Sequence, residues 1–467
     1  MIFLLLAVVV CAIEFLARRM ERQISDNTSV ATISGTDHEI DKTGQLVRHC
    51  AVGVSIVFLL FAYFLSASAV IALVIVGLFA WLRRGLTLLE QTTADASRLA
   101  RLSKALKDPN LSNAKLAMFF SAVDLPTPDH VNAWESEIDA LDVPWLILTS
   151  EHHHFSALKA AGRNNAVFLP NLTSALQGLP GGLRAVLYAN NAQKNRCVLR
   201  SLPNLQHVQI LHGDSDKPPS YSPLTKNYDR VFVSGQMAIE RYVRNGVHIP
   251  EDRFRIVGRP QVKAIVPADT KTATDDVLQI VYMPTWRGFY EDTQFSSLDR
   301  ADKILEAVMA LQQKVHVIFK PHPLSYKDPD WPLIEKRIDN ILAERLTSWV
   351  TGEFSSPEHR PFDLYNRADI LICDISSVMI DFLYANKPLI TVLPHGFKSE
   401  DRANFPSLEA CYNLSSDLQN LQSELSAAVG PDPLQGERAR IRASAFGDLD
   451  KPPGAAFQAA CEELIQD

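Results

Sequence analysis

The sequence predicts an α/β protein with two domains, each built on a parallel sheet, behind N-terminal transmembrane helices. Three observations predict this architecture. From about Asn110 onward, short β-rich runs alternate with stretches of helical spacing, which is typical of parallel sheets with crossover helices. The runs fall into two groups, separated by the polar stretch Pro267 to Asp276. Ahead of both groups lie two long apolar runs that suit a membrane better than a soluble core.

The composition limits the class of protein. At 467 residues with 47% hydrophobic content, the chain is long enough for more than one core. A net charge of -7 argues against a nucleic-acid-binding protein, because that function needs a basic surface. The six cysteines contain no Cys-x-x-Cys pair, so we expect reduced thiols and a cytosolic catalytic region.

We expect residues 1–86 to form a membrane anchor. Met1 to Ala17 is almost wholly apolar and lacks a cleavage signature, which indicates an uncleaved anchor. Cys50 to Leu82 carries no charge, and as one helix it reaches roughly 50 Å, beyond the ~30 Å hydrocarbon layer. It therefore forms either one long tilted helix or a hairpin broken near Ser66-Ala-Ser68, and the number of passes stays open. Arg83 and Arg84 favour a cytoplasmic exit, with the catalytic domains on the cytoplasmic side of the inner membrane.

Residues 87–108 alternate charged and apolar side chains, and we expect a linker or an amphipathic helix there. The first α/β domain is expected over residues 109–266 and the second over residues 277–467. The strands expected in the first domain are Trp145 to Leu148, Ala166 to Leu169, Ala185 to Tyr188, His207 to Leu211 and Val231 to Val233. Those expected in the second are Leu278 to Tyr282, Val315 to Phe319, Ile370 to Cys373 and Leu389 to Val392.

The segment Asp369 to Leu389 carries the strongest signal for a binding site. Ile370 to Cys373 suits a buried strand, Val378 to Tyr384 has helical spacing, and Asp374-Ile-Ser-Ser377 lies between them. A strand that turns into a helix at Asp-x-Ser-Ser directs hydroxyls, N–H groups and the positive helix end at one point, which suits a pyrophosphate. The alternative is an ordinary turn in which a serine caps the helix, and this segment alone does not decide between the two.

Two further strand ends of the second domain carry cationic side chains. Thr285 and Arg287 follow one strand, and Arg287 offers phosphate a bidentate fork, although a surface arginine in a turn is the alternative. Lys320 and His322 follow the next strand, in a loop that two prolines stiffen. Because the carboxyl ends of parallel strands share one edge of a sheet, the three loops together indicate an anion site.

In the first domain, His212 and Gly213 follow the strand His207 to Leu211. A histidine at this position is a candidate base, and the glycine permits another group to approach the backbone closely. The alternative is a loop histidine satisfied by a neighbouring carbonyl group. Asp214 and Asp216 form an Asp-x-Asp pattern, which is a weak signal for a divalent metal.

Other patterns exclude some classes of enzyme. No Gly-x-x-x-x-Gly-Lys-Ser/Thr occurs, which removes a P-loop ATPase, and no Gly-x-Ser-x-Gly occurs, which weighs against an α/β-hydrolase. The triple histidine His152 to His154 is a weak metal signal, because adjacent residues rarely face one ion.

Taken in chain order, these residues resemble the CDP-glycerol glycerophosphotransferase family, the teichoic-acid-type transferases with a GT-B fold. The similar patterns are His212-Gly213, Tyr282-x-Pro-Thr-x-Arg287, His322-Pro323, and Asp374-x-Ser-Ser377 with Asp381. Val231-Phe-Val-Ser234 with Gly258-Arg-Pro260 is similar to the segment that links the two domains of the family. The likeness covers roughly Arg184 to Leu393.

The resemblance implies two Rossmann-like domains, an N-terminal one for the acceptor and a C-terminal one for the nucleotide donor. It implies metal-independent transfer of glycerol phosphate from CDP-glycerol, or of a related CDP-polyol's group, to a hydroxyl of a lipid-linked or polymeric acceptor, with CMP leaving and no cofactor. Such an enzyme serves the synthesis of a cell-envelope polymer, teichoic-acid-like or capsular.

The resemblance also implies roles for individual residues. The catalytic residues are expected to be His212, His322 and Arg287; the donor-binding residues Thr285, Lys320, Asp374, Ser376, Ser377 and Asp381; and the acceptor side Gly213, Asp214 and Lys217. Cationic and hydrogen-bonding groups suit this reaction, because phosphoryl transfer depends mostly on positioning and charge stabilisation. His212 is expected to take the acceptor's proton or to orient its phosphate. Asp381 is expected to orient His322 or a donor hydroxyl, and the alternative is a solvated or capping carboxylate.

Other functions fit the same patterns less well. A transferase of the same fold that uses CDP-ribitol or a nucleotide sugar is the nearest alternative. A metal-dependent glycosyltransferase built on Asp214 and Asp216 is another. A non-catalytic membrane scaffold is the third, although a scaffold does not need His212, Arg287 and His322 together.

Overall fold

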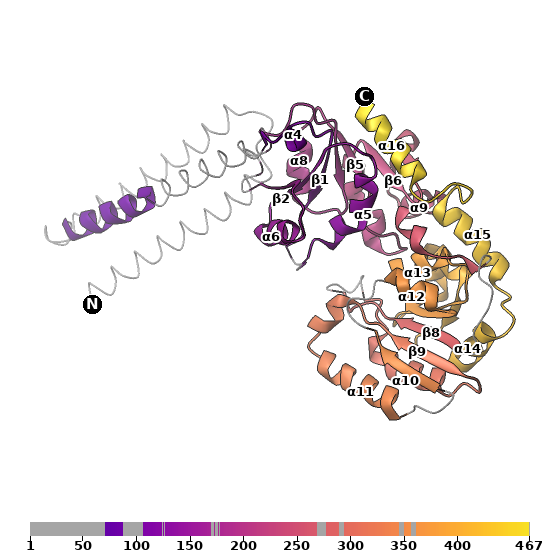
Figure 1. Cartoon of the computed structure of the whole chain (residues 1–467). Coiled ribbons are helices and arrows are strands. Elements are labelled where there is room, and N and C mark those ends of the chain that lie inside the picture. The colour runs from indigo at the N-terminus through magenta and orange to yellow at the C-terminus, as the bar shows by residue number, and fades with distance from the viewer. Residues whose placement is uncertain are drawn as a thin grey trace. The chain divides into compact units, whose positions relative to one another are not determined.

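The computed structural model describes residues 71–86 and 106–466, apart from residues 124, 126, 170, 171, 173–175, 177, 269–276, 289–293, 345–349 and 356–360. The chain divides into two compact units. Unit 1 comprises Met1–Pro128, Pro144–Leu183 and Ala192–Leu205, and unit 2 comprises Asp129–Val143, Arg184–Asn191 and Gln206–Asp467. Helices and strands alternate along the described chain, as the sequence predicts for an α/β protein (Figure 1).

Unit 1 contains three parallel strands in the order β3-β2-β1. β1 (Leu116–Phe120) pairs with β2 (Trp145–Thr149), and β2 pairs with β3 (Ala166–Phe168). Every residue of β1 and β2 is buried, which is typical of parallel strands covered on both faces. Helices among the described residues of this unit include α4 (Pro109–Ser112), α6 (His152–Ala160) and α8 (Asn195–Ser201).

Unit 2 begins with four parallel strands in the order β4-β5-β6-β7. They are β4 (Ala185–Tyr188), β5 (Gln206–Gln209), β6 (Arg230–Val233) and β7 (Phe254–Ile256). The helical elements that accompany them are α5 (Asp129–Asp139), η1 (Pro218–Tyr221), η2 (Pro223–Asn227), α9 (Gln236–Arg244), η3 (Glu251–Arg253) and η4 (Pro260–Ala264).

Unit 2 also contains a six-stranded parallel sheet in the order β10-β9-β8-β11-β12-β13. Its strands are β8 (Leu278–Met283), β9 (Val315–Phe319), β10 (Val350–Phe354), β11 (Ile370–Asp374), β12 (Leu389–Val392) and β13 (Tyr412–Leu414). The helical elements are η7 (Leu298–Arg300), α10 (Ala301–Met309), η8 (Pro323–Lys327), α11 (Trp331–Glu344), α12 (Pro361–Arg367), α13 (Ser377–Leu383), η9 (Ser399–Asn404), η10 (Pro406–Ala410), α14 (Leu421–Val429), α15 (Gln435–Phe446) and α16 (Ala455–Gln466).

Both faces of the six-stranded sheet are covered by helices. Along β8, Ile280 and Tyr282 belong to one apolar cluster with residues of α10, α11 and α14. Val281 and Met283 belong to a second cluster with residues of α13 and α15. Because successive side chains of a strand point to opposite faces, the alternating apolar residues of β8 fill both layers. This packing fixes the carboxyl ends of the strands, where the predicted site residues lie.

All nine predicted strands are present, with boundary shifts of at most two residues. β1, β7, β10 and β13 were not predicted. The expected boundary between two domains, Pro267 to Asp276, falls mostly outside the described residues, and the expected division at 266 and 277 stays a prediction.

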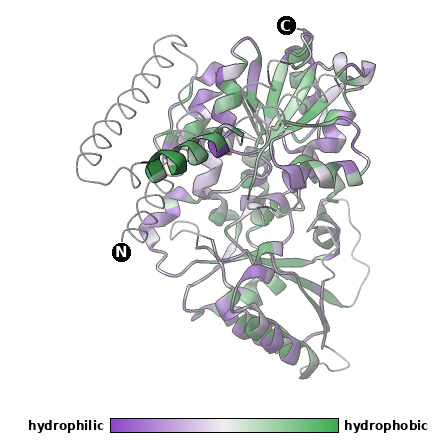
Figure 2. Ribbon diagram, turned by 90° about the vertical axis from the view of Figure 1, so that its left-hand side faces the viewer, coloured by the Kyte–Doolittle hydropathy of each residue, from purple (hydrophilic) through white to green (hydrophobic). Residues whose placement is uncertain are grey.

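The expected membrane anchor also lies mostly outside the described residues, as do Met1 to Ala17 and most of the linker 87–108. Residues 71–86, the described end of the second apolar run, form a helix that Figure 2 shows as strongly hydrophobic over most of its length. Its large side chains are exposed, with Phe79 at 69% and Trp81 at 73%. Within the described part of the chain, no helix is both long enough and apolar enough to span a bilayer.

Candidate functional site

Three loops that leave the carboxyl edge of the six-stranded sheet contact one another. The Thr285 N–H after β8 donates a hydrogen bond to Asp374 Oδ2 at the end of β11, at 2.7 Å. The His322 N–H after β9 donates to the Pro284 carbonyl at 3.2 Å. The loops after β8, β9 and β11 thus lie together, as neighbouring parallel strands require.

Asp374 connects these loops and is fully buried. Its Oδ2 accepts from the backbone N–H groups of Thr285 and Ser297, while its Oδ1 has no hydrogen-bond partner among the described residues. Burial raises the pKa of Asp374 to about 6, although the hydrogen bonds and the charge of Lys217 lower it. Asp374 therefore connects the loops through hydrogen bonds, and its ionisation changes the charge at this edge of the sheet.

Ser376 and Ser377 follow Asp374 at the start of α13. Ser376 occupies the N-cap position, but its side chain makes no capping hydrogen bond. Its Oγ is buried and has no hydrogen-bond partner among the described residues. A buried hydroxyl left without a partner is costly, and a ligand oxygen can supply one. The capping alternative therefore does not explain the Ser376 side chain.

His322 is a neutral hydrogen-bond donor. Its Nδ1 accepts a hydrogen bond from the Leu324 N–H at 3.1 Å, so the proton of the neutral ring is on Nε2. Burial, followed by the charge of Lys217, lowers the pKa of His322 to about 4. The ring is uncharged at pH 7. Its Nε2–H group is suited to donate a hydrogen bond to a phosphate oxygen, and it is not suited to accept a proton as a general base.

Two lysines carry positive charge at this edge. Lys217 Nζ lies over the ring of Phe295, 5.3 Å from its centroid. Burial lowers the pKa of Lys217, and the Asp374 carboxylate opposes this effect. Burial also lowers the pKa of Lys320. Lys217 was predicted on the acceptor side, and that role stays a prediction; the groups that interact with its charge, Asp374 and His322, lie at strand ends of the six-stranded sheet.

Arg287 forms ion pairs with two carboxylates that the sequence analysis did not predict as its partners. Its Nη1 lies 2.8 Å from Asp330 Oδ2 and 3.4 Å from Asp328 Oδ1. The hydrogen bond with Asp330 raises the pKa of Arg287, and the pair is partly exposed to solvent. Exposed ion pairs are weak, about 0–1 kcal/mol, so a phosphate can take the place of Asp330. The predicted roles of Arg287 and Thr285 toward a donor stay predictions.

His212 has the opposite tautomer to His322. Its Nδ1 lies 2.9 Å from the Ala189 carbonyl oxygen, which only accepts, so Nδ1 carries the proton and Nε2 has a lone pair. The side chain remains accessible to solvent. Desolvation of the ring by the surrounding protein lowers the pKa of His212. The hydrogen bond to Ala189 raises this pKa, and the charge of Arg259 lowers it further. A neutral imidazole with an available Nε2 lone pair is the form that a general base needs.

Gly213 brings the His212 loop against the Ser377 loop. A Cβ atom at position 213 would lie 3.2 Å from Ser377 Cβ and 3.5 Å from Ser377 Oγ. The first distance is shorter than ordinary van der Waals contact, so only glycine fits without displacing Ser377. The candidate base and the candidate anion loop are therefore adjacent within unit 2.

Asp214 and Asp216 are occupied by one buried arginine. Arg241 of α9 binds Asp214 through Nη1, and its Nε donates to Asp216 at 2.9 Å. Asp214 also accepts from the Ser234 hydroxyl, and Asp216 from the Ser407 hydroxyl. No cluster of metal-ligating side chains occurs among the described residues. The Asp-x-Asp pattern here forms an ion-pair network, and its expected role on the acceptor side stays a prediction.

Asp381 is paired with Arg259 rather than with His322. The Arg259 guanidinium binds both carboxylate oxygens, with Nη2 3.0 Å from Oδ2, and both residues are buried. Arg259 also approaches the His212 carbonyl, at 3.4 Å from Nη1 and 3.5 Å from Nη2. Asp381 therefore contacts the candidate base only through Arg259.

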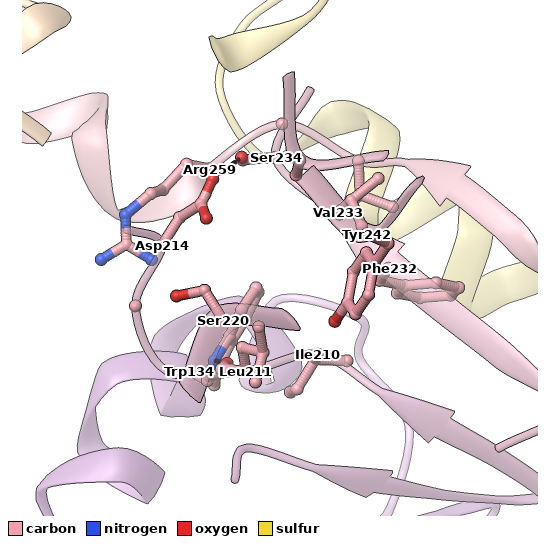
Figure 3. A pocket seen from close by; sticks show the side chains of 14 residues that line it. Trp134, Ile210, Leu211, Asp214, Ser220, Phe232, Val233, Ser234, Tyr242 and Arg259 are labelled. Carbon is pink, nitrogen blue, oxygen red and sulfur yellow. Dashed lines mark hydrogen bonds between the residues drawn. The ribbon is translucent and has the colours of Figure 1, made fainter. Parts of the chain in front are cut away.

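A small cavity adjoins the His212 loop. Figure 3 shows Asp214, Ser220, Ser234 and Arg259 around it, with Trp134 hydrogen-bonded to Leu211 on one side. Its volume of about 30 Å³ is room for about one water molecule. It is too small for a nucleotide, and the predicted donor-binding role of the loops described above stays a prediction.

Three residues that hold the His212 loop were missed from sequence. They are His130 and Trp134 of α5, and Arg241 of α9. Arg241 lies on the buried face of α9 with Ala238 and Tyr242, and the helical spacing could have indicated its burial. Nothing in the sequence around His130 or Trp134 points to contacts with residues so distant along the chain.

Comparison with known proteins shows a family likeness in one segment of the chain. Residues 186–396 match the family model described as CDP-glycerol:poly(glycerophosphate) glycerophosphotransferase. The match runs from the second residue of β4 to beyond β12 and includes every predicted site residue. No curated protein sequence matches the chain.

The fold of this chain is similar to that of several solved structures. A putative UDP-N-acetylglucosamine 2-epimerase from Listeria monocytogenes superposes with a TM-score of 0.51 at 11% identity, covering 76% of this chain and 96% of that chain. The wall teichoic acid polymerase TagF soaked with CDPG gives a TM-score of 0.49 at 13% identity, covering 82% and 97%. TagF without that soak gives 0.48 at 14%, covering 82% and 97%.

The two parallel sheets with their covering helices are consistent with a GT-B-like fold. The resemblance that the sequence motifs indicated is confirmed by the family match. Residues 186–396 of the chain are therefore similar to the CDP-glycerol glycerophosphotransferases.

Proposed function

We propose that the protein transfers glycerol phosphate from CDP-glycerol to a hydroxyl of a lipid-linked or polymeric acceptor, in the synthesis of a teichoic-acid-like or capsular polymer. The family match supports the donor and the reaction type. The adjacency of Gly213 and Ser377 is the observation that carries the proposal, because it places a candidate base beside a candidate anion site.

In the proposed step, the acceptor oxygen attacks the phosphorus that bears glycerol. A new P–O bond forms to the acceptor, and the bond from that phosphorus to the bridging oxygen breaks. The bridging oxygen keeps the electron pair and leaves as part of CMP. The proton of the acceptor hydroxyl passes to Nε2 of His212, which is the nitrogen with the lone pair.

The donor side supplies hydrogen bonds and positive charge to the pyrophosphate. The Ser376 hydroxyl is buried without a partner among the described residues, and Ser377 lies next to it. His322 offers a neutral Nε2–H, and Lys217 a positive charge nearby. Such groups stabilise charge best when they are fixed before the substrate arrives. Arg287 joins them when it exchanges Asp330 for a phosphate oxygen.

The protein is further proposed to be anchored in the inner membrane, with its catalytic region in the cytoplasm. The exposed apolar helix over residues 71–86, which ends in Arg83 and Arg84, supports this proposal. Such an anchor would hold the catalytic region beside a lipid-linked acceptor. Flotation of the full-length chain with vesicles, compared with a chain that lacks residues 1–86, tests the anchor. Equal flotation of the two chains would remove it.

The experiment that tests the reaction uses full-length protein in detergent, labelled CDP-glycerol and a lipid-linked acceptor. We expect release of CMP together with label in the acceptor. CDP-ribitol and UDP-sugars serve as alternative donors, and the donor that gives turnover identifies the substrate. Absence of turnover with any of these donors would support a scaffold instead. Loss of activity in EDTA would favour the metal-dependent alternative.

A further inference from the structure

The imidazole of His212 is stacked on a second imidazole. The rings of His130 and His212 have centroids 3.5 Å apart and planes only 6° from parallel. His130 belongs to α5 and is half-buried, whereas His212 follows β5. Face-to-face contact at this distance restricts the tilt of both rings. It leaves the edge of His212, where the two ring nitrogens lie, for hydrogen bonding.

The residue before His212 is held in an uncommon conformation. Leu211 has a φ of 49°, in the left-handed region that residues other than glycine seldom adopt. Its N–H donates to Gln209 Oε1 at 3.0 Å, and its carbonyl accepts from Trp134 Nε1. Such conformations persist where the surroundings fix them, and they are frequent at functional sites. Leu211 turns the chain out of β5 and directs His212.

One face of α5 supplies two of these contacts. His130 and Trp134 are four residues apart, so they lie on the same side of the helix. Trp134 fixes the backbone at Leu211, and His130 contacts the side chain of His212. The Ala189 carbonyl fixes the ring of His212 through Nδ1. The plane and the rotation of the His212 ring are therefore set from two directions.

We propose that His130 is a positioning residue for His212: by stacking, it holds the ring in the orientation in which Nε2 takes the acceptor's proton. This inference rests on the proposed function of His212 as the base. A neutral aromatic face also accommodates the positive charge that His212 gains on protonation. The role needs an aromatic ring at position 130, and it does not need a titrating group there.

The charges around the ring pair bear on its protonation. Arg259 is adjacent to the His212 carbonyl and disfavours a second positive charge. Asp381 neutralises Arg259, and Asp214, two residues after His212, is bound by Arg241. On α5, Asp129 precedes His130. The proton that His212 takes is therefore opposed by the Arg259 guanidinium, whose charge Asp381 offsets.

The test compares three variants of the full-length chain. His130→Ala removes the ring, and His130→Phe keeps an aromatic face without a charge. Asn132→Ala, at an exposed position of the same helix, is the matched control. We expect His130→Ala to lower kcat at least tenfold with KM within about twofold, because misplacement of a catalytic group affects the chemical step. His130→Phe should keep kcat within about threefold, and Asn132→Ala should match the wild type.

Two results would overturn the proposal. One is wild-type kcat in His130→Ala, and the other is an equal loss of kcat in His130→Phe and His130→Ala. A fall in kcat without a change in KM, together with its recovery in His130→Phe, is the readout that a general loss of structure does not give.

A spectroscopic measurement separates this inference from the proposed function. Histidine ring signals are recorded by NMR on the full-length chain, with His212 assigned by its loss in His212→Gln. In His130→Ala, the His212 ring signals should move downfield, since the stacked ring that shields them is gone, and they should broaden as the ring becomes mobile. Unchanged signals would refute the stacking role even if the wild type proves inactive toward CDP-glycerol. An inactive wild type with shifted signals would contradict only the reaction.

Discussion

His212 and His322 present opposite nitrogens to a ligand. His212 donates from Nδ1 to the Ala189 carbonyl and keeps a lone pair on Nε2, while His322 accepts at Nδ1 from the Leu324 N–H and keeps a proton on Nε2. In each case a single backbone group selects the tautomer. The first arrangement suits a base and the second suits a donor to phosphate oxygens. The backbone hydrogen bonds thereby make one histidine a hydrogen-bond acceptor at Nε2 and the other a donor at Nε2.

The buried carboxyl of Asp374 predicts a change of stability with pH. Its pKa in the folded protein is about 6, above the ordinary value of 3.8. Between these values the folded form retains a proton that the unfolded form releases, so the free energy of unfolding falls as pH rises. We expect Asp374→Asn to gain about 2–3 kcal/mol relative to the wild type between pH 4 and pH 7. Urea unfolding of both proteins at several pH values measures this difference. A difference that stays constant with pH would show that Asp374 is ionised throughout.

Gly213→Ala should impair catalysis more than folding. The added Cβ would be 3.2 Å from Ser377 Cβ, so one of the two loops must shift. We expect kcat/KM to fall at least tenfold, with the free energy of unfolding lowered by about 1–2 kcal/mol. Gly436→Ala is the matched control, since no atom lies within 4 Å of a Cβ added there. Full activity in Gly213→Ala would mean that the two loops need not be in contact.

The pairing of Arg241 with Asp214 and Asp216 predicts a large stability effect. Arg241→Met leaves two buried carboxylates without their counterion, and loss of one partner from a buried pair costs about 3–5 kcal/mol. Arg244→Met, an exposed position on the same helix, should change stability by less than about 0.5 kcal/mol. Urea unfolding measures both variants. Similar stability of the two variants would contradict the network.

Arg287 and Asp330 should have opposite effects on donor affinity. Arg287→Ala removes a charged donor to phosphate and should raise KM for CDP-glycerol about tenfold. Asp330→Asn removes the carboxylate that competes for Arg287 and should lower KM, with little change in thermal stability because the pair is partly exposed. Asp339→Asn, exposed on α11, is the control. A raised KM in Asp330→Asn would show that Asp330 orients Arg287 for binding.

The strands that were predictable share one property. They are short runs rich in β-branched and large apolar residues, such as Val315 to Phe319, between polar loops. β1 (Leu116–Phe120) is equally buried, but Leu-Ala-Met-Phe-Phe also suits a helix, so its pattern does not distinguish the two. β7 and β13 have three residues each, and Arg255 and Asn413 at their centres interrupt the apolar run that marks β3, a strand of the same length. β10 lies at the end of its sheet and contains Gly352 and Glu353, which are poor strand formers.

The order of strands along the chain predicted which loops lie together, but it did not predict the hydrogen-bond and ion-pair partners of individual side chains. Thr285 follows β8 and Asp374 ends the neighbouring strand β11, so their proximity follows from the parallel topology. Asp381 pairs with Arg259, and Arg287 pairs with Asp330. These pairs depend on side-chain positions in segments that no common sequence motif connects. The same holds for His130, whose contact with His212 connects a helix and a strand end far apart in sequence. The tautomers depend on single backbone groups, which no pattern of residue types encodes.

The steady-state kinetics of His212→Gln and His322→Gln with CDP-glycerol and a lipid-linked acceptor test the central claim most directly. Loss of a general base should lower kcat of His212→Gln by about 10²–10⁴ with KM for the donor nearly unchanged. Glutamine in place of His322 keeps an N–H donor, so KM for CDP-glycerol should rise severalfold while kcat stays within about tenfold. A His212→Gln variant with wild-type kcat, or a larger loss of kcat in His322→Gln than in His212→Gln, would contradict the assignment of His212 as the base.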